Sequence, residues 1–279
     1  MTRVVALVVT HNSMRWIDET LASITAQDRM PDSIVVVDDA STDGTREWVR
    51  ELLGERVTIV PSTAASEDRT TRIAHNFRQG VQACEPGDIV VLGDHDDIWH
   101  PDRVSHQASL LEELPDVAMV ASDGRLVDEA GNPQGGTLRT TFPVRAGFNE
   151  LSEAERMSVV LRRSVATGGA SAVRRTAFAD VYIPDGWLHD RWWSLVAAAR
   201  EQLLLDDALV IDYRVSAGQE VGLDTGLQEH AKLARLIAGA SGVRTSMSKM
   251  DDIRQRLVPF ATEATKPELT GTRLLRNLM

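Results

Sequence analysis

The chain has 279 residues, of which 43% are hydrophobic and 25% charged, a composition that supports a sizeable globular core. The formal net charge is −11, and an acidic chain lacks the basic surface that non-specific nucleic-acid binding needs, so we expect no nucleic-acid partner. The single cysteine, Cys84, excludes an internal disulfide framework. No apolar run has the length of a membrane span, and no signal-peptide pattern precedes the first strand pattern. These features predict a cytoplasmic protein.

The first half of the chain alternates strand and helix patterns. Runs of β-branched and apolar residues, typical of strands buried on both faces, occupy 3–9, 33–37, 56–60, 88–92 and 117–121. Amphipathic helices are expected over 12–27, 42–53, 70–84 and 101–114, with starts at Asn12 or Ser13, at Ser41 or Thr42, and at Pro101. This alternation predicts a mostly parallel sheet built from βαβ units. Such sheets bind ligands beyond the carboxyl ends of their strands.

The second half has a different pattern. We expect a turn at 128–136, a loop at 137–147, helices at 150–163 and 188–201, a short strand within 166–173 and strand segments over 203–214. The glycines of 218–226 predict a loop, and the remaining residues predict helices interrupted at Pro259 and Pro267. The chain therefore divides into a first half, 1–124, a second half of the same domain, 125–226, and a helical extension, 227–279.

Acidic side chains gather directly after the expected strand at 88–92. Asp94, His95, Asp96 and Asp97 follow it without helical neighbours that would neutralise them. Carboxylates so close repel one another unless a cation lies among them. Mg²⁺ and Mn²⁺ prefer oxygen ligands and commonly bridge to a substrate diphosphate. The pattern predicts a divalent-cation site, and the alternative is a solvated acidic loop or a set of helix caps.

A second acidic pair, Asp38 and Asp39, ends the expected strand at 33–37. A carboxylate at this place can accept hydrogen bonds from a nucleobase N–H or from ribose hydroxyls. The alternative is helix capping, for which Ser41 or Asp43 suffices. The chain has neither the glycine-rich fingerprint of NAD-dependent enzymes nor the phosphate loop of nucleoside triphosphatases, and this counts against both classes.

A third cluster opens the expected helix at 188–201. Asp190 is flanked by His189 and Arg191, and tryptophans, including Trp192, follow at once. Aromatic faces pack against the apolar faces of sugars, and a nearby carboxylate is a candidate general base. The alternative is that the tryptophans belong to the core and that Asp190 pairs with Arg191 or caps the helix.

Five segments in this order resemble the family 2 glycosyltransferases of the GT-A fold. They read VVTHNS, VVDDASTDGT, DHDDIWHPDRV, TGGASAVRR and HDRWW, and the resemblance covers roughly residues 3 to 222. The likeness is greatest to the rhamnosyltransferase-like branch, whose members typically read DQDDIWLPDK and HDWW. The resemblance implies an α/β GT-A fold, which is a Rossmann-like, mostly parallel sheet flanked by helices, with an acceptor-side subdomain and a helical C-terminal tail. It also implies transfer of a sugar from a nucleotide-diphosphate donor with inversion.

The resemblance further implies roles for individual residues. Asp190 would be the general base that deprotonates the acceptor hydroxyl, and Asp96 or Asp97 would hold Mg²⁺ or Mn²⁺. Arg72 and the two glycines of TGG have plain alternatives, an exposed helix arginine and a simple bend. The nucleotide-sugar would be bound by Thr10, His11, Asn12, Asp38, Asp39, Arg72, Asp94, His95, Gly168 and Gly169. The acceptor or sugar pocket would be formed by Trp99, His189, Arg191 and Trp192.

The sequence departs from the family pattern at one place. Family members often read YRQHG near the end of this domain, and in some relatives that histidine helps to bind the metal. Here Tyr213 and Arg214 are followed by Val215-Ser216 without a histidine. This departure implies weaker or water-mediated metal binding, or a donor-binding protein without turnover. Because Asp190 is retained, we expect an active enzyme. Nucleotidyl transfer is a further alternative, although THNSMRW is not the glycine-rich basic loop typical of that class.

Several partners remain open on the sequence. The donor is dTDP-rhamnose or a UDP-sugar, and the acceptor is a hydroxyl of a surface polysaccharide, a lipid-linked glycan or a natural product. The positively charged tail, with Ile253, Leu257 and Phe260 beside Arg254 and Arg256, has the pattern of a helix that touches the inner face of a membrane. It equally fits a helix that packs on the catalytic domain or forms a homodimer, and we expect packing.

Overall fold

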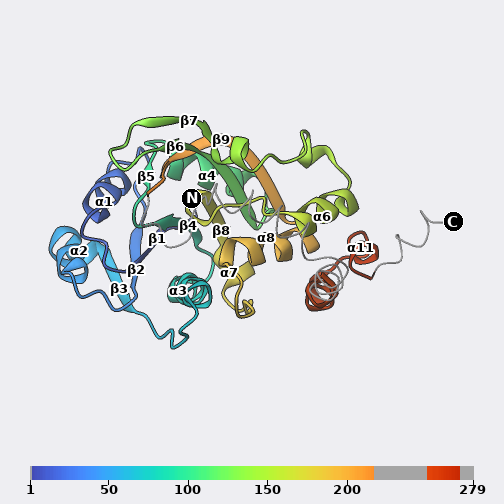
Figure 1. Ribbon diagram of the computed structural model, residues 1–279, viewed down its shortest axis with the longest axis horizontal. Helices are drawn as coiled ribbons and strands as arrows, with labels where there is room; N and C mark the ends of the chain where they lie inside the picture. Colours follow the sequence, from blue (N-terminus) through green and yellow to red (C-terminus); the bar gives the residue numbers. More distant parts are fainter. Residues whose placement is uncertain (1, 217–249, 271–279) are drawn as a thin grey trace, which may run out of the picture.

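A mixed β-sheet with helices on both faces organises the computed structural model, which describes residues 2–216 and 250–270 (Figure 1). The described strands are β1 (Val4–Thr10), β2 (Ser33–Asp38), β3 (Val57–Pro61), β4 (Ile89–Asp94), β5 (Ile98–Trp99), β6 (Met119–Val127), β7 (Pro133–Thr137), β8 (Ser171–Arg174) and β9 (Leu203–Arg214). The described α-helices are α1 (Ile17–Thr25), α2 (Thr45–Leu53), α3 (Arg69–Ala83), α4 (Arg103–Glu113), α5 (Leu138–Thr141), α6 (Glu153–Arg162), α7 (Arg175–Phe178), α8 (His189–Ala199) and α11 (Lys266–Thr270). Short 3₁₀ turns are η1 (Gly54–Arg56), η2 (Phe148–Glu150), η3 (Gly168–Ala170) and η4 (Val258–Phe260).

The strand order is β3-β2-β1-β4-β8-β6-β9-β5, and β7 pairs with β6. The first four strands in this order are parallel, whereas β8 runs antiparallel to both β4 and β6. The register sets Thr10 beside Asp38 and Val9 beside Asp94, so the carboxyl ends of β1, β2 and β4 meet at one edge of the sheet. The sheet is continuous across residue 124, which lies inside β6. The predicted mostly parallel α/β fold is confirmed.

The two faces of the sheet are covered by different helices. Alternate residues of β1 serve the two faces, because successive side chains of a strand point to opposite sides. Leu7 belongs to the core under α3, α6 and α8, and Val8 belongs to the core under α1, α2 and α4. In Figure 1, α3 and α7 lie below β4 and β8, and α4 lies on the opposite side of these two strands.

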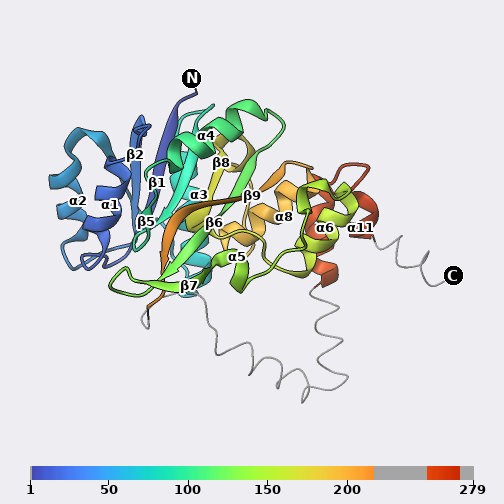
Figure 2. The same ribbon diagram turned by 90° about the horizontal axis from the view of Figure 1, so that it is seen from above.

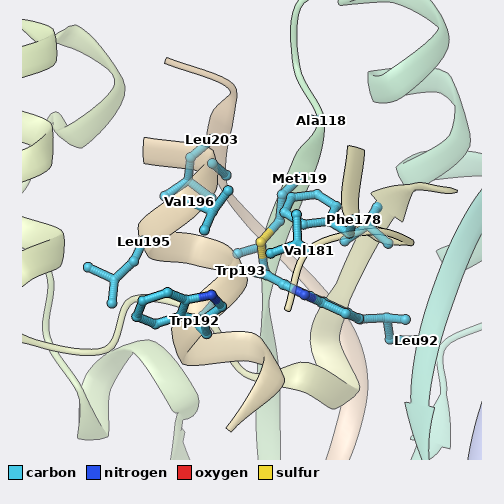
Figure 3. Close-up of a cluster of buried hydrophobic side chains, with 14 of the residues drawn as sticks. Leu92, Ala118, Met119, Phe178, Val181, Trp192, Trp193, Leu195, Val196 and Leu203 are labelled. Carbon is cyan, nitrogen blue, oxygen red and sulfur yellow. The ribbon is translucent and has the colours of Figure 1, made fainter. Parts of the chain in front are cut away.

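The tryptophans at the start of α8 are part of the first of these cores. Trp193 is fully buried, and its ring centroid lies 5.4 Å from that of Phe178. Figure 3 shows Trp193 among Met119, Phe178 and Val181, with Trp192 beside it on the same helix. These large apolar side chains anchor α8 against the sheet. The helix that carries Asp190 is therefore held by the core.

Three helices begin later than the sequence predicts. The first begins at Ile17, the second at Thr45 after Gly44, whose φ is +95°, and the fourth at Arg103 rather than at Pro101. Two of the residues expected as caps, Asn12 and Ser41, instead bind each other across loops, because the backbone N–H of Asn12 donates to the Ser41 hydroxyl. The carboxylate of Asp43 accepts hydrogen bonds from the backbone N–H groups of Met14 and of Thr45, the first residue of α2.

The segment from 128 to 147 is more ordered than predicted. The expected turn contains β7, which pairs with β6, and the expected loop contains α5. Thr137 and Thr140 form a capping box at the start of α5, which satisfies backbone N–H groups that a short helix otherwise leaves free. Figure 2 shows α5 beside β6 and β7 on one edge of the molecule.

The described part of the C-terminal segment packs on the rest of the fold. Residues 250–257 are helical, and Leu257 is fully buried. The guanidinium of Arg200 lies 4.9 Å from the ring centroid of Phe260, and the Thr265 hydroxyl donates to the carbonyl of Ala199. The predicted loop at 218–226 and the helical pattern of 227–249 lie outside the described residues. Within 2–216 and 250–270, no helix combines the length and the apolarity needed to cross a membrane.

Candidate active site

A pocket of about 370 Å³ lies at the edge of the sheet where β1, β2 and β4 end. This volume is in the range of small-molecule sites. The structure brings ten of the predicted site residues to its wall: Thr10, His11, Asp39, Asp94, His95, Asp96, Gly168, His189, Asp190 and Arg191. The other seven are not in the wall: Asn12, Asp38, Arg72, Asp97, Trp99, Gly169 and Trp192.

The two neighbouring carboxylates at the end of β2 have different environments. Asp38 is buried, and its Oδ2 accepts hydrogen bonds from Nη2 and Nε of Arg46 at 2.8 and 3.0 Å. Asp39 faces the pocket, and its Oδ2 lies 3.2 Å from Nε of Arg72. His11 Nδ1 lies 2.5 Å from the carbonyl of Asp39. Asp38 therefore fixes the strand end, whereas Asp39 is available to a ligand and Arg72 acts on the pocket through it.

Asn12 organises the loop beside these carboxylates. Its φ is +49°, and its side-chain carbonyl accepts a hydrogen bond from the backbone N–H of Thr42. Its own backbone N–H donates to the hydroxyl of Ser41. The amide thus joins the end of β1 to the loop after β2 and does not reach the pocket wall.

The acidic cluster at the end of β4 combines burial with mutual repulsion. Burial, followed by the charges of Asp96 and Asp190, raises the pKa of Asp94 to about 7. Burial and the charges of Asp96 and Asp94 also hold the pKa of Asp97 well above its usual range. Asp97 is fully buried and accepts a hydrogen bond from the backbone N–H of Arg214, whereas Asp96 lines the pocket. Of the two predicted metal ligands, Asp96 is therefore the one that faces the pocket.

Two glycines make room for the side chains of this cluster. A Cβ on Gly168 would lie 2.4 Å from Nε2 of His189, and a Cβ on Gly169 would lie 2.6 Å from Oδ2 of Asp97. Real side chains do not come so close. The sequence interpretation placed a donor or acceptor against these glycines. The structure places the protein's own imidazole and carboxylate beside their α-carbons, and Gly168 itself also lines the pocket.

Asp190 lies in the first turn of α8 with both carboxylate oxygens held. Its Oδ2 accepts a hydrogen bond of 2.9 Å from Gly168 N–H, and its Oδ1 accepts from Arg191 N–H. Burial raises the pKa of Asp190 to about 6 in spite of these bonds and of the Arg191 charge. A carboxylate in this range is suited to act as a general base near neutral pH.

Arg191 positions this carboxylate. Its guanidinium donates hydrogen bonds to the carbonyls of Val160, Leu161 and Arg163, at the carboxyl end of α6. These carbonyls have no partner within their own helix, so the guanidinium caps α6 and joins it to α8. Arg191 was predicted to contact the acceptor or sugar. Arg191 lines the pocket, and its guanidinium is bound to the backbone carbonyls at the end of α6.

The three aromatic residues predicted for the sugar pocket behave differently. His189 lines the pocket, and its ring stacks on Phe77 at a centroid distance of 3.7 Å. Burial lowers its pKa to about 3, so the ring is neutral. Trp99 and Trp192 are 2% exposed, and the structure places both in the core instead of the pocket. Trp99 packs under Gly93 and against the guanidinium of Arg103. A tryptophan side chain buries more apolar surface in the core than at the rim of a pocket, and this favours the buried position.

Two buried arginines behind the acidic cluster escaped the sequence interpretation. Arg103 is fully buried, donates to the carbonyl of Leu92 at 2.6 Å, and its charge lowers the pKa of both Asp94 and Asp97. Arg214 donates from Nε to the carbonyl of Asp96 at 2.9 Å. In the sequence, Arg103 is marked only by its place in the segment DHDDIWHPDRV, and Arg214 only by its place after Tyr213. Both arginines read as surface residues until the packing is known.

The acidic cluster fits a divalent cation that a ligand helps to hold. Within the described ranges, no group of three or more histidine, cysteine, aspartate or glutamate side chains is arranged to hold a metal ion. However, Asp96 faces the pocket, and Oδ2 of the neighbouring Asp97 is buried without a hydrogen-bond partner among those residues. A cation would relieve the repulsion that raises the pKa of Asp94. The donor set therefore suits a metal whose coordination is completed by phosphate oxygens.

Comparison with known proteins decides the family. The sequence profile described as glycosyl transferase family 2 matches residues 5–182, more than half of the chain. The chain belongs to glycosyl transferase family 2. A Bacillus subtilis protein of this kind, TuaG, whose name assigns it provisionally to teichuronic acid biosynthesis, is 27% identical over 127 residues, or 43% of this chain and 48% of that protein. The uncharacterized protein Rv1520 of Mycobacterium tuberculosis is 26% identical over 191 residues, or 66% of this chain and 51% of that protein. The chain thus spans about half the length of these curated relatives.

Solved structures share the architecture of this family 2 chain. TarS of Staphylococcus aureus, residues 1–349 in complex with UDP, matches with a TM-score of 0.59 and 17% identity over 98% of this chain and 87% of that chain. Glucosyl-3-phosphoglycerate synthase of Mycobacterium tuberculosis, in complex with Mn²⁺, UDP and glucosyl-3-phosphoglycerate, matches with a TM-score of 0.53 and 19% identity over 84% and 76%. At these identities the likeness shows the fold, and the predicted GT-A fold is confirmed.

Proposed function

We propose that this family 2 protein is an inverting glycosyltransferase that moves a sugar from a nucleotide-diphosphate donor to a hydroxyl acceptor. The observation that carries the proposal is that Asp96 and Asp190, from opposite parts of the chain, line one pocket. Asp96 is placed to bind a cation, and Asp190 is placed to accept a proton. Their environments differ, as acid–base chemistry with two carboxylates requires. UDP and Mn²⁺ in the solved structure of glucosyl-3-phosphoglycerate synthase support a nucleotide diphosphate and a divalent cation as ligands.

In this proposal the donor lies along the strand ends from β2 to β4. Asp39, Thr10 and His11 contact the nucleoside, and the diphosphate lies at Asp94 and Asp96. Asp96 would hold Mg²⁺ or Mn²⁺, which supplies a Lewis acid that neutralises the charge of the leaving diphosphate. The buried guanidinium of Arg103 lies behind the cluster and keeps it from carrying three uncompensated charges.

Asp190 is the general base in this proposal. The acceptor hydroxyl transfers its proton to the carboxylate of Asp190 as its oxygen attacks the anomeric carbon, and the bond from that carbon to the diphosphate breaks. Attack on the face opposite the leaving group inverts the anomeric configuration. Gly168 and Arg191 fix the carboxylate, and neutral His189 adds no competing charge.

The residues that replace the missing histidine motif support an active site. Tyr213 lines the pocket, and Arg214 binds the backbone of the acidic loop at Asp96. The loop is thus held in place by this segment although the segment offers no histidine. We propose that the metal is coordinated by the carboxylate, the diphosphate and water, and that the enzyme turns over.

The substrates and setting are proposed more broadly. UDP in TarS and GDP-mannose in the solved mannosyltransferase of Pyrobaculum calidifontis (TM-score 0.54, 19% identity, covering 100% and 81% of the two chains) support a nucleotide-sugar donor. We propose a UDP-sugar or dTDP-rhamnose, and an acceptor from surface-glycan or natural-product synthesis. The work would take place in the cytoplasm or at the inner face of the membrane.

The test is a comparison of wild-type protein with Asp190→Asn. A thermal-shift screen of UDP-, dTDP- and GDP-sugars with Mn²⁺ first identifies the donor. Asp190→Asn should bind that donor within about twofold of wild type and lose at least ~100-fold in transfer or donor hydrolysis, because the base contributes to the chemical step alone. Asp185→Asn, an exposed carboxylate outside the pocket wall, is the matched control. Wild-type turnover by Asp190→Asn would refute the base, and donor binding by wild type without turnover would indicate a binding protein.

A further inference from the structure

The end of the pocket farthest from Asp39 carries three side chains that the proposed chemistry does not use. Asp123, Arg139 and Phe142 all belong to its wall. Asp39 follows β2 and Asp123 lies in β6, four steps apart in the strand order. At about 4.8 Å per step, the two ends are separated by roughly 19 Å measured along the sheet. A nucleotide-sugar at β2 and β4 therefore leaves the β6 end open to a second substrate.

Asp123 is a buried carboxylate with one free oxygen. It is 6% exposed, and its Oδ1 accepts hydrogen bonds from the backbone N–H groups of Gly124 and Arg139 at 2.8 and 2.9 Å. Its Oδ2 has no partner in the part of the chain that the structure describes. The register of β6 against β9 shifts on both sides of Asp123, and such irregularities re-aim a side chain out of the sheet. A nearly buried acceptor without a donor points to a ligand that supplies one.

Arg139 offers donors beside this acceptor. Its Nη2 donates to the carbonyls of Ala121 and Asp206 at 3.2 and 3.0 Å, which fixes the plane of the guanidinium. Its Nε and Nη1 have no partner among residues 2–216 and 250–270. The fixed guanidinium thus presents oriented donors to the pocket.

Phe142 presents an aromatic face at the mouth of the same end. The residue is 40% exposed although it lines the pocket, and its backbone N–H donates to the carbonyl of Leu138 at 2.8 Å at the end of α5. The side chain of Leu138 packs against Gly124, where a Cβ would lie 2.9 Å from its Cδ1. The glycine therefore lets α5 lie close on β6, and the ring is held in place on a supported helix.

We propose that Asp123, Arg139 and Phe142 form a subsite for a pyranose acceptor, an inference that rests on the proposed function. An aromatic ring packs against the apolar C–H face of a pyranose, while a carboxylate and a guanidinium bind its hydroxyls. A purely apolar acceptor would leave Asp123 without a partner. A strongly anionic acceptor would be repelled by Asp123 together with Asp190. The acceptor bound at this subsite is therefore a pyranose whose hydroxyls bind Asp123 and Arg139.

The subsite is tested by saturation-transfer NMR on the full chain. The probes are methyl glycosides of rhamnose, glucose and N-acetylglucosamine, with 3-phosphoglycerate and 1-hexanol as open-chain probes, each with and without UDP and Mn²⁺. At least one pyranoside should bind more tightly than either open-chain compound. Phe142→Ala should weaken that binding about fivefold or more, and Asp123→Asn, which keeps an oxygen for the two backbone donors, should weaken it comparably. Tyr182→Ala removes an exposed aromatic ring that is not in the pocket wall and should leave binding unchanged.

The outcomes separate this inference from the proposed function. UDP binding with Mn²⁺ should stay within twofold in Phe142→Ala and Asp123→Asn, because neither residue is at the nucleotide end. Equal binding of pyranosides and open-chain probes, or pyranoside binding that survives both substitutions, overturns the subsite. Loss of UDP binding in wild type would instead overturn the donor proposal, and the measurements without nucleotide would still decide the subsite. Melting curves identify any variant that fails to fold, in which case Phe142→Leu, which keeps apolar volume but not the ring, replaces Phe142→Ala.

Discussion

The backbone N–H of Gly168 donates a hydrogen bond of 2.9 Å to Oδ2 of Asp190, 22 residues away in the sequence. This bond joins the turn before β8 to the first turn of α8. At the same point the ring of His189 fills the space that a Cβ of Gly168 would need. The orientation of the proposed base therefore depends on the backbone of Gly168, which also lines the pocket.

Gly168→Ala should reduce turnover by about tenfold or more while leaving UDP affinity within twofold. The added methyl displaces His189 and with it the N–H that holds Asp190, and small misplacements of catalytic groups are costly. The check is donor hydrolysis alongside calorimetry with UDP and Mn²⁺. Because the clash is with the imidazole, adding His189→Ala should recover part of the folding stability lost in Gly168→Ala. Full activity of Gly168→Ala would contradict the positioning role.

Activity should fall on the acidic side of pH 6. Burial raises the pKa of Asp190 to about 6, and only the deprotonated carboxylate accepts a proton. The rate at saturating donor should therefore rise about tenfold per pH unit below 6 and level off above 7. UDP binding measured by calorimetry over the same range separates this effect from loss of the metal. A rate that stays constant from pH 5 to 8 would show that another group acts as the base.

Arg46→Met should destabilise the fold far more than Arg15→Met. Arg46 pairs with Asp38, which is 1% exposed, so removing the arginine leaves a buried charge without its partner. Arg15 pairs with Glu129 on the surface, where both side chains are well exposed. Urea unfolding should give a loss of about 2–4 kcal/mol for Arg46→Met and less than about 1 kcal/mol for Arg15→Met. Equal losses would mean that Asp38 finds other partners.

The sequence was sufficient for the parallel strands β1 to β4 and for part of the pocket wall, but not for β5 and β7. Runs such as Val4–Thr10 are strands because β-branched residues favour extended backbone and because both faces are buried, so local preference and tertiary context agree. The same agreement brings Asp39 and Asp94 to one edge of a parallel sheet. Asp39 and Asp94 at these strand ends therefore line the pocket, whereas Asp38 and Asp97 beside them are not in its wall.

The rest depended on packing between distant segments. Strand β8 enters the sheet antiparallel between β4 and β6, and only this insertion places Gly168 and Gly169 against His189 and Asp97. Trp99 was predicted to lie in the sugar pocket, but β5, which carries it, pairs with β9, and the side chain is buried in the core. Arg103 and Arg191 donate hydrogen bonds to backbone carbonyls of distant segments, and no local sequence pattern indicates these contacts.

The central claim is that a nucleotide diphosphate binds this pocket through a divalent cation at Asp96. Calorimetric titration of UDP into wild-type protein and Asp96→Asn, each with and without Mn²⁺, tests it most directly. We predict millimolar or tighter binding by wild type with Mn²⁺, at least about tenfold weaker binding without the metal, and no metal dependence in Asp96→Asn. Absence of UDP binding to wild type in the presence of Mn²⁺, or metal-dependent binding that Asp96→Asn retains in full, would contradict it.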